Sequence, residues 1–199
     1  MGAILQSLGR TVIAGVVVLI LLIVIAGGFA RGVAPDQAWL SFFMRWLHVI
    51  SGVMWIGLLW YFNFVQIPSM PKIPDEQKPA VSKVIAPAAL FWFRWAALAT
   101  VVTGLLLAMM MGYIGRALTL QEGARAIGIG MWLGLIMAFN VWFIIWPNQK
   151  KALGIVQVAP EEKAKAARLA MLTSRFNTML SIPMLYMMVI QQNRGGAVF

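Results

Sequence analysis

The sequence predicts an all-α integral membrane protein, a bundle of about five transmembrane helices with a cytoplasmic N-terminus and a periplasmic C-terminus. Two observations predict this class. Of the 199 residues, 61% are hydrophobic and only 11% are charged, whereas a soluble domain of average composition carries about 25% charged residues. The apolar residues also gather in runs of about 20, enough for a helix to cross the roughly 30 Å hydrocarbon core of a bilayer. We therefore expect a single transmembrane domain over residues 1–199.

The apolar runs predict the individual spans. Backbone groups in lipid must be hydrogen-bonded within their own segment, so each span is expected to be a helix. The first has no charge and exceeds the apolar region of a cleaved signal peptide, so we interpret it as a retained anchor. The fifth contains Pro183, which should kink the helix or free a carbonyl. The predicted spans are residues 11–30, 38–65, 85–113, 126–146 and 169–190.

The basic residues of the connecting segments predict the orientation. Cytoplasmic loops carry an excess of Lys and Arg, which favours a multi-pass protein of the bacterial inner membrane with its N-terminus inside. This topology explains the net charge of +10 without any nucleic-acid partner. The nine basic residues assigned to the cytoplasmic face are Arg10, Lys72, Lys78, Lys83, Lys150, Lys151, Lys163, Lys165 and Arg168, and the four assigned to the other face are Arg31, Arg116, Arg125 and Arg194.

Two long connections lie on the predicted cytoplasmic face. Four prolines within residues 68–83 predict an ordered or extended loop rather than a helix. Within residues 149–168, Pro160 is followed by Glu161 and Glu162, which is typical of a helix N-terminus. We expect that helix to run directly into the fifth span.

Few residues of this chain could carry chemistry. There is no Cys, which excludes disulfides, thiolate catalysis and iron–sulfur ligation. One His and six acidic residues leave little material for acid–base catalysis, and no nucleotide-binding loop or nucleophile–base pair is present.

Three arginines lie inside the predicted spans, namely Arg45, Arg94 and Arg175. Intramembrane charges are costly and often functional, yet every acidic residue lies in a loop or at a segment end. The arginines could snorkel, bind carbonyls, or bind an anion such as a lipid phosphate, a haem propionate, a substrate or a partner's carboxylate. We also expect Trp92 and Trp95 to stack on Arg94. The candidate polar residues facing a ligand or partner are Asn140, Arg175, Asn177 and Ser181.

The single histidine, His48, follows Arg45 by one helical turn. A neutral imidazole could ligate the iron of haem b or the magnesium of a (bacterio)chlorophyll. The alternative is that no cofactor binds and the ring hydrogen-bonds a neighbouring helix. Gly52 would leave room for a flat group or a close helix. The candidate cofactor-binding residues are His48, Arg45, Arg94, Trp55 and Gly52.

Three motifs together resemble a known family. They are 45–57, with Arg45-Trp46-Leu47-His48, Gly52 and Trp55-Ile56-Gly57; 140–151, which reads NVWFIIWPNQKK; and 174–185, with Ser174-Arg175-Phe176-Asn177-Thr178 and Pro183. Over residues 39–188 the chain resembles the N-terminal membrane domain of the bacterial membrane-bound urate hydroxylase. The resemblance implies a membrane oxidoreductase that passes electrons to cytochrome c. In that family a cytochrome c domain with a C-x-x-C-H site follows, whereas this chain contains no Cys.

Two functions follow from these observations. The first is an accessory or cofactor-anchoring subunit of a larger respiratory or photosynthetic redox complex, in contact with other membrane subunits. The alternative is a stand-alone oxidoreductase of urate hydroxylase type that passes electrons to a separate cytochrome c. A transporter ranks below both, because the sequence shows no inverted repeat.

Overall fold

The computed structural model describes residues 2–25 and 36–191 and is helical throughout, with no strand in either range. The chain divides into two units, residues 1–40 and 41–199. The first unit contains two helices, α1 (Gly2–Leu5) and α2 (Leu8–Ile25).

The helix α2 corresponds to the first predicted span. From Val12 to Ile25 it is apolar on every side, and none of its residues is buried. A helix that is hydrophobic all round suits a membrane interior better than water. Residues 26–30 of the predicted span lie outside the described residues.

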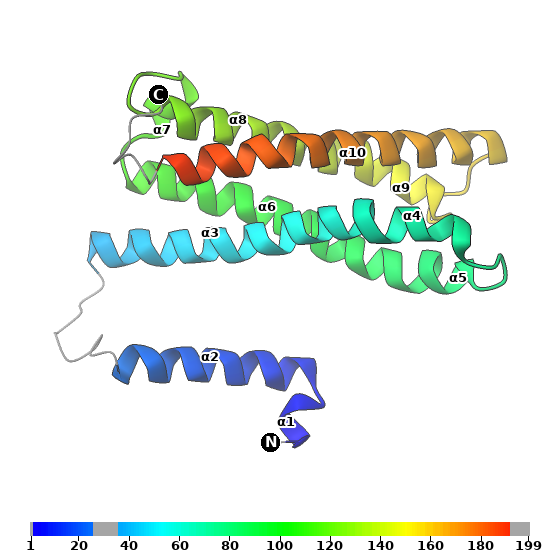
Figure 1. Ribbon diagram of the computed structural model, residues 1–199, viewed down its shortest axis with the longest axis horizontal. Helices are drawn as coiled ribbons and strands as arrows, with labels where there is room; N and C mark the ends of the chain where they lie inside the picture. Colours follow the sequence, from blue (N-terminus) through cyan, green and yellow to red (C-terminus); the bar gives the residue numbers. More distant parts are fainter. Residues whose placement is uncertain (1, 26–35, 192–199) are drawn as a thin grey trace. The chain divides into compact units, whose positions relative to one another are not determined.

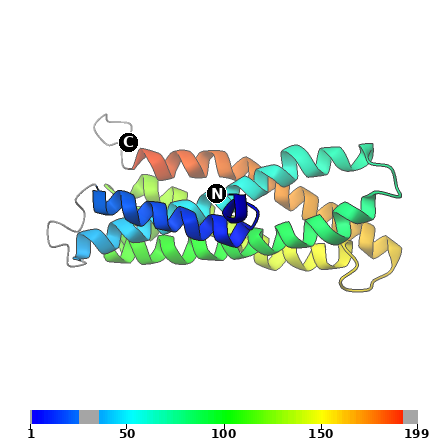
Figure 2. The same cartoon turned by 90° about the horizontal axis from the view of Figure 1, so that it is seen from below.

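The second unit is built from four helical runs in which each packs antiparallel to the next (Figure 1). Seen from below in Figure 2, the runs lie along one common direction. The short α7 lies in the turn between the second and third runs. The runs are α3 (Gln37–Trp60) with η1 (Tyr61–Gln66), α4 (Ile67–Ser69) and η2 (Met70–Lys72); α5 (Lys78–Ala80) with η3 (Val81–Ile85) and α6 (Ala86–Met110); after α7 (Ile114–Leu118), α8 (Arg125–Phe139) with η4 (Asn140–Ile145) and α9 (Trp146–Ala152); and α10 (Pro160–Ile190).

The proline-rich connection is far more helical than predicted. Only residues 73–77 between the first two runs are outside helices. The expectation of a loop over residues 68–83 was wrong because three of its four prolines, Pro68, Pro71 and Pro79, lie in the first turns of short helices. A helix's first turn has no intrahelical partner for the missing N–H, so proline is tolerated there.

The fourth run begins as predicted. Helix α10 starts at Pro160, with Glu161 and Glu162 in its first turn, and continues without a break through Pro183 to Ile190. By length and hydropathy, however, four segments of the described chain could cross a membrane, and α10 is not among them. Four of the five predicted spans therefore correspond to segments long and apolar enough to cross a membrane. The polar residues of α10 lower its hydropathy.

The core of the second unit lies between all four runs. Its largest fully buried side chains include Trp55, Leu59, Phe93 and Met137. A smaller cluster packs α7 against α6 and α8. There a Cβ at Gly128 would collide with the Ala117 carbonyl, so glycine is required for the two helices to approach this closely.

Three of the helical segments, η1, η3 and η4, are π-helical. Such segments make up well under 1% of residues in proteins and are frequent at functional sites. Both η1 and η4 pack on α10. The widened turns therefore lie beside the most polar helix of the bundle.

The two ends of the second unit differ in charge. One end carries the α4–α5 and α9–α10 connections, and the other carries the turn around α7 (Figure 1). At the α7 end lie Arg116 and Arg125, together with Arg45, which contacts Met111 in the turn after α6. The basic residues at or near the opposite end, here called the lysine-rich end, are Lys72, Lys78, Lys83, Lys150, Lys151, Lys163, Lys165 and Arg168.

Candidate functional site

His48 contacts α6 through one ring nitrogen. Its Nδ1 lies 2.9 Å from the Thr100 carbonyl oxygen and 3.3 Å from the Thr103 hydroxyl. A carbonyl can only accept, so Nδ1 carries the hydrogen and donates it to Thr100. In the neutral ring this leaves Nε2 as a base, and Nε2 has no hydrogen-bond partner among the described residues. The hydrogen bond to a neighbouring helix is therefore present, and it leaves Nε2 free.

Two glycines line the contact between α3 and α6. A Cβ at Gly104 would lie 2.8 Å from Cε1 and 3.0 Å from Nδ1 of His48, so the imidazole fits because this position has no side chain. A Cβ at Gly52 would meet the Thr100 methyl group at 3.9 Å, an ordinary contact. The room that Gly52 was predicted to leave is taken up by the close approach of α6. Sequence reasoning missed Thr100, Thr103 and Gly104.

Arg45 lies one turn before His48 and contacts the turn that follows α6. Its Nη2 donates to the sulfur of Met111 over 3.2 Å, and its Nε is buried without a hydrogen-bond partner. Burial raises the pKa of Tyr113 in the same turn, and the positive charge of Arg45 partly offsets that rise. Arg45 and His48 therefore share one side of α3, and each keeps one nitrogen without a partner.

Trp55 lies two turns further along the same side of α3. Its side chain is 1% exposed, inside the core cluster, and its Nε1 has no partner. Of the predicted cofactor-binding residues, the structure thus places His48, Arg45, Gly52 and Trp55 along the inner face of one helix.

Arg94 lies apart from this group. Its guanidinium carbon is 3.8 Å from the ring centroid of Trp146 and 5.5 Å from that of Phe91. The predicted stacking on Trp92 and Trp95 was wrong. Residues adjacent in a helix diverge by about 100°, whereas a residue three positions away lies on the same side. Trp95 instead makes an edge contact with Trp142, with centroids 5.5 Å apart.

The polar residues of α10 form a buried seam across the bundle. Asn177 and Asn140 are joined by a hydrogen bond of 2.8 Å, and Nδ2 of Asn177 donates to the Met137 carbonyl over 2.9 Å. Ser181 accepts from Nε1 of Trp60 over 2.9 Å. The structure brings the predicted residues Asn140, Asn177 and Ser181 together. Their polar atoms form hydrogen bonds within the chain and do not face an open cavity.

Two members of the seam were not predicted. Asn63 of η1 donates to the Ser174 hydroxyl over 2.8 Å, and its own Oδ1 is buried without a partner. The spacing of Ser174, Asn177 and Ser181 along one helix face could have indicated Ser174. Asn63 could have been predicted from the sequence because it is a polar residue within the apolar span 38–65.

Arg175 does not join the seam. It is exposed, while Asn177 is fully buried. Positions two apart on a helix lie on nearly opposite sides, so the guanidinium of Arg175 is directed away from the bundle core. It was predicted with Asn140, Asn177 and Ser181, and the structure separates it from them.

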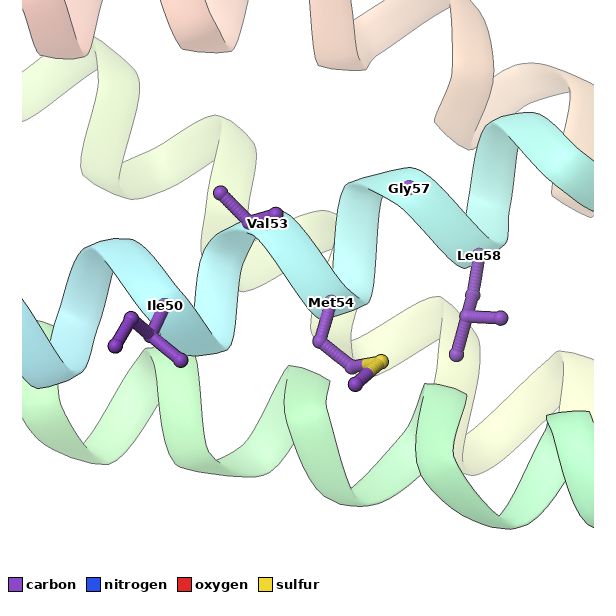
Figure 3. A pocket seen from close by; sticks show the side chains of 5 residues that line it. All are labelled: Ile50, Val53, Met54, Gly57 and Leu58. Carbon is purple, nitrogen blue, oxygen red and sulfur yellow. The ribbon is translucent and has the colours of Figure 1, made fainter. Parts of the chain in front are cut away.

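Figure 3 shows the five side chains of α3 that line a pocket. All five residues that line it are apolar: Ile50, Val53, Met54, Gly57 and Leu58. It lies on the opposite side of the helix from His48 and offers no polar group. Among the described residues no group of three or more His, Cys, Asp or Glu side chains could hold a metal ion.

Comparison with known proteins gives one match. Residues 117–193 match a family described as "Urate oxidase N-terminal". The matched part runs from the end of α7 through α10 and includes Asn140, Asn177 and Ser181, but not Arg45 or His48. Neither the curated proteins nor the solved structures contain a match to this chain.

Proposed function

We propose that this chain is an integral membrane subunit that anchors a haem within a larger redox complex of the bacterial inner membrane. The observation that carries the proposal is the free Nε2 of His48. Histidines that ligate metals commonly donate their other ring N–H to a carbonyl, which fixes the tautomer and orients the ring. The hydrogen bond from Nδ1 to the Thr100 carbonyl has that arrangement.

The neighbouring residues fit such a group. Gly104 allows the imidazole to lie against α6, so the ring's position is set by packing as well as by the hydrogen bond. Arg45 has a buried Nε without a partner and no carboxylate bonded to it, so a haem propionate would satisfy it. A bound haem would supply one-electron transfer, with His48 as one axial ligand. As the chain has one histidine, a second axial ligand would be Met, a residue of another subunit, or none.

A (bacterio)chlorophyll would use the same nitrogen as ligand to its magnesium. Arg45, which lies one helical turn before His48, favours haem over a chlorophyll, because the two propionates of haem are free anions that it could bind. The two groups differ in their visible spectra, so one measurement distinguishes them.

The charge distribution supports a membrane orientation. The lysine-rich end faces the cytoplasm in this proposal, following the rule that cytoplasmic loops are enriched in Lys and Arg. Helix α10 is the fifth span, with its seam buried in the bundle rather than facing lipid. Hydrogen bonds between helices satisfy polar groups of this kind in membranes.

A second candidate is an oxidoreductase of urate hydroxylase type that passes electrons to a separate cytochrome c. The match of residues 117–193 to the urate oxidase N-terminal family favours it. In this alternative, Arg45 would bind an anionic substrate beside His48.

Purification from membranes in mild detergent tests both candidates. The haem-anchoring subunit predicts a Soret band and constant co-purifying membrane subunits. The second candidate predicts urate-dependent reduction of added cytochrome c by the isolated chain. A chain without haem that catalyses this reduction would contradict the first proposal, and a haem-containing chain inert towards urate would contradict the second.

A further inference from the structure

Two cations converge on one indole ring near the lysine-rich end. The Arg94 guanidinium carbon is 3.8 Å from the Trp146 ring centroid, and the Lys150 ammonium nitrogen is 5.7 Å from the same centroid. Neither forms a salt bridge with any carboxylate of the described residues. Both cations lie against the same ring without a carboxylate partner, so an anion that reaches both would be stabilised.

The described acidic residues at this end do not meet that need. Asp75 pairs with Lys78, and Glu162 pairs with Lys151 over 2.6 Å. Glu76 and Glu161 form no salt bridge with any described residue. Lys151 is the residue next to Lys150 in α9, and it already pairs with the carboxylate of Glu162. That carboxylate is therefore not available to Lys150. The anion would therefore come from outside the chain.

An apolar groove begins one helical turn away. It lies between α6 and the run formed by α8 and η4. Leu98 follows Arg94 by four residues on α6, and Trp142 precedes Trp146 by four residues, so groove and cations share one inter-helix surface. The groove is lined by Leu98, Val101, Leu135, Ala138, Phe139, Trp142 and Phe143.

We propose that this surface binds one acidic phospholipid. Its phosphate lies between Arg94 and Lys150, and one acyl chain occupies the groove towards Val101. Val101 lies seven positions after Arg94, which is about 10 Å along the helix axis. Part of one acyl chain is long enough to cover this distance. Trp146 lies where a tryptophan is favoured, at the level of the lipid headgroups. Basic pockets between membrane helices are known to bind acidic headgroups.

The apolar groove identifies the ligand as a lipid rather than free phosphate. A free phosphate would gain from the two cations but would leave the groove unfilled. An acidic lipid would both neutralise the two cations and fill the groove, whereas a zwitterionic lipid would only fill the groove. This inference does not depend on any haem at His48, since Arg94 contacts Phe91 and Trp146 and none of the residues around His48.

Native mass spectrometry tests the proposal. The full chain is reconstituted in equal amounts of phosphatidylglycerol and phosphatidylcholine, extracted in mild detergent, and its retained lipids are identified. We expect one phosphatidylglycerol to be retained preferentially. In R94Q/K150Q its retention should fall about fivefold for each cation removed, and R94K should retain it.

The control is K163Q/K165Q, which removes the same charge from exposed positions at the same end. It should retain phosphatidylglycerol as the unaltered chain does. Val101→Trp fills the groove without changing charge and should lower retention, which also tests the proposal should R94Q/K150Q fail to fold. Equal losses in both double variants, or full retention in V101W, would overturn the proposal. Loss of the lipid on adding excess inorganic phosphate would assign the site to free phosphate instead.

Discussion

Asn177 on α10 accepts a hydrogen bond from Nδ2 of Asn140 on η4 over 2.8 Å, and both side chains are buried. Asn177 also donates to the Met137 carbonyl. The contact joins two antiparallel helices without any charge. It lies inside the segment that matches the urate oxidase N-terminal family.

Substitution of Asn177 should destabilise the bundle. Asn177→Leu keeps the approximate side-chain volume but leaves Nδ2 of Asn140 without a partner and removes the side-chain donor to the Met137 carbonyl. Because a buried polar group without a partner costs about 1–3 kcal/mol, we expect a lower Tm in detergent, measured by the loss of helical circular dichroism.

The double variant N140L/N177L identifies the cause. It removes both polar side chains, so its destabilisation should be smaller than the sum of the two single effects. Arg175→Gln, which alters an exposed neighbour, should leave the Tm unchanged. Strictly additive effects of the two leucines would show that the asparagines do not act as a pair.

The packing of His48 against Gly104 gives a second prediction. In Gly104→Ala the new methyl group would meet the imidazole at 2.8 Å, so the ring must move and its bond to Thr100 should lengthen. Overpacking of this kind typically costs about 1–3 kcal/mol, and the Tm should fall accordingly. Gly57→Ala is the matched control, because no atom lies within 4 Å of a Cβ at that position. Equal stability of the two variants would contradict the close contact.

The charge of Arg45 should be visible in the titration of Tyr113. Burial raises the pKa of Tyr113, and Arg45 opposes this by favouring the phenolate. Arg45→Gln removes that favourable charge, so the pKa of Tyr113 should rise further. The measurement is a spectrophotometric titration, in which the signal of Tyr113 is isolated by subtracting that of Tyr113→Phe. A fall in this pKa, or no change, would show that Arg45 is not close to the phenol.

Most of the fold could be predicted because hydropathy and helix-capping signals are local. Pro160, Glu161 and Glu162 marked the start of α10, and the long apolar runs marked the helices. The connection over residues 68–83 was mistaken because composition does not distinguish a proline in a loop from one in a helix's first turn. That distinction depends on whether the following residues find helical partners.

The site could be predicted only where residues share one helix face. Arg45 and His48 stand one turn apart, so their common side of α3 followed from the sequence. Their partners Thr100, Gly104 and Met111 belong to α6 and the turn after it. The register between two helices is set by packing that no single-helix pattern contains. For the same reason Arg94 was assigned to neighbouring tryptophans instead of Trp146.

We propose above all that Nε2 of His48 ligates a haem. The most direct measurement is the visible spectrum of the purified chain, of His48→Gly, and of His48→Gly with added imidazole. We predict a Soret band in the unaltered chain, its loss in H48G, and its partial return with imidazole, which can replace the missing ligand. A chain without a Soret band, or an H48G variant that keeps the full band, would contradict the claim.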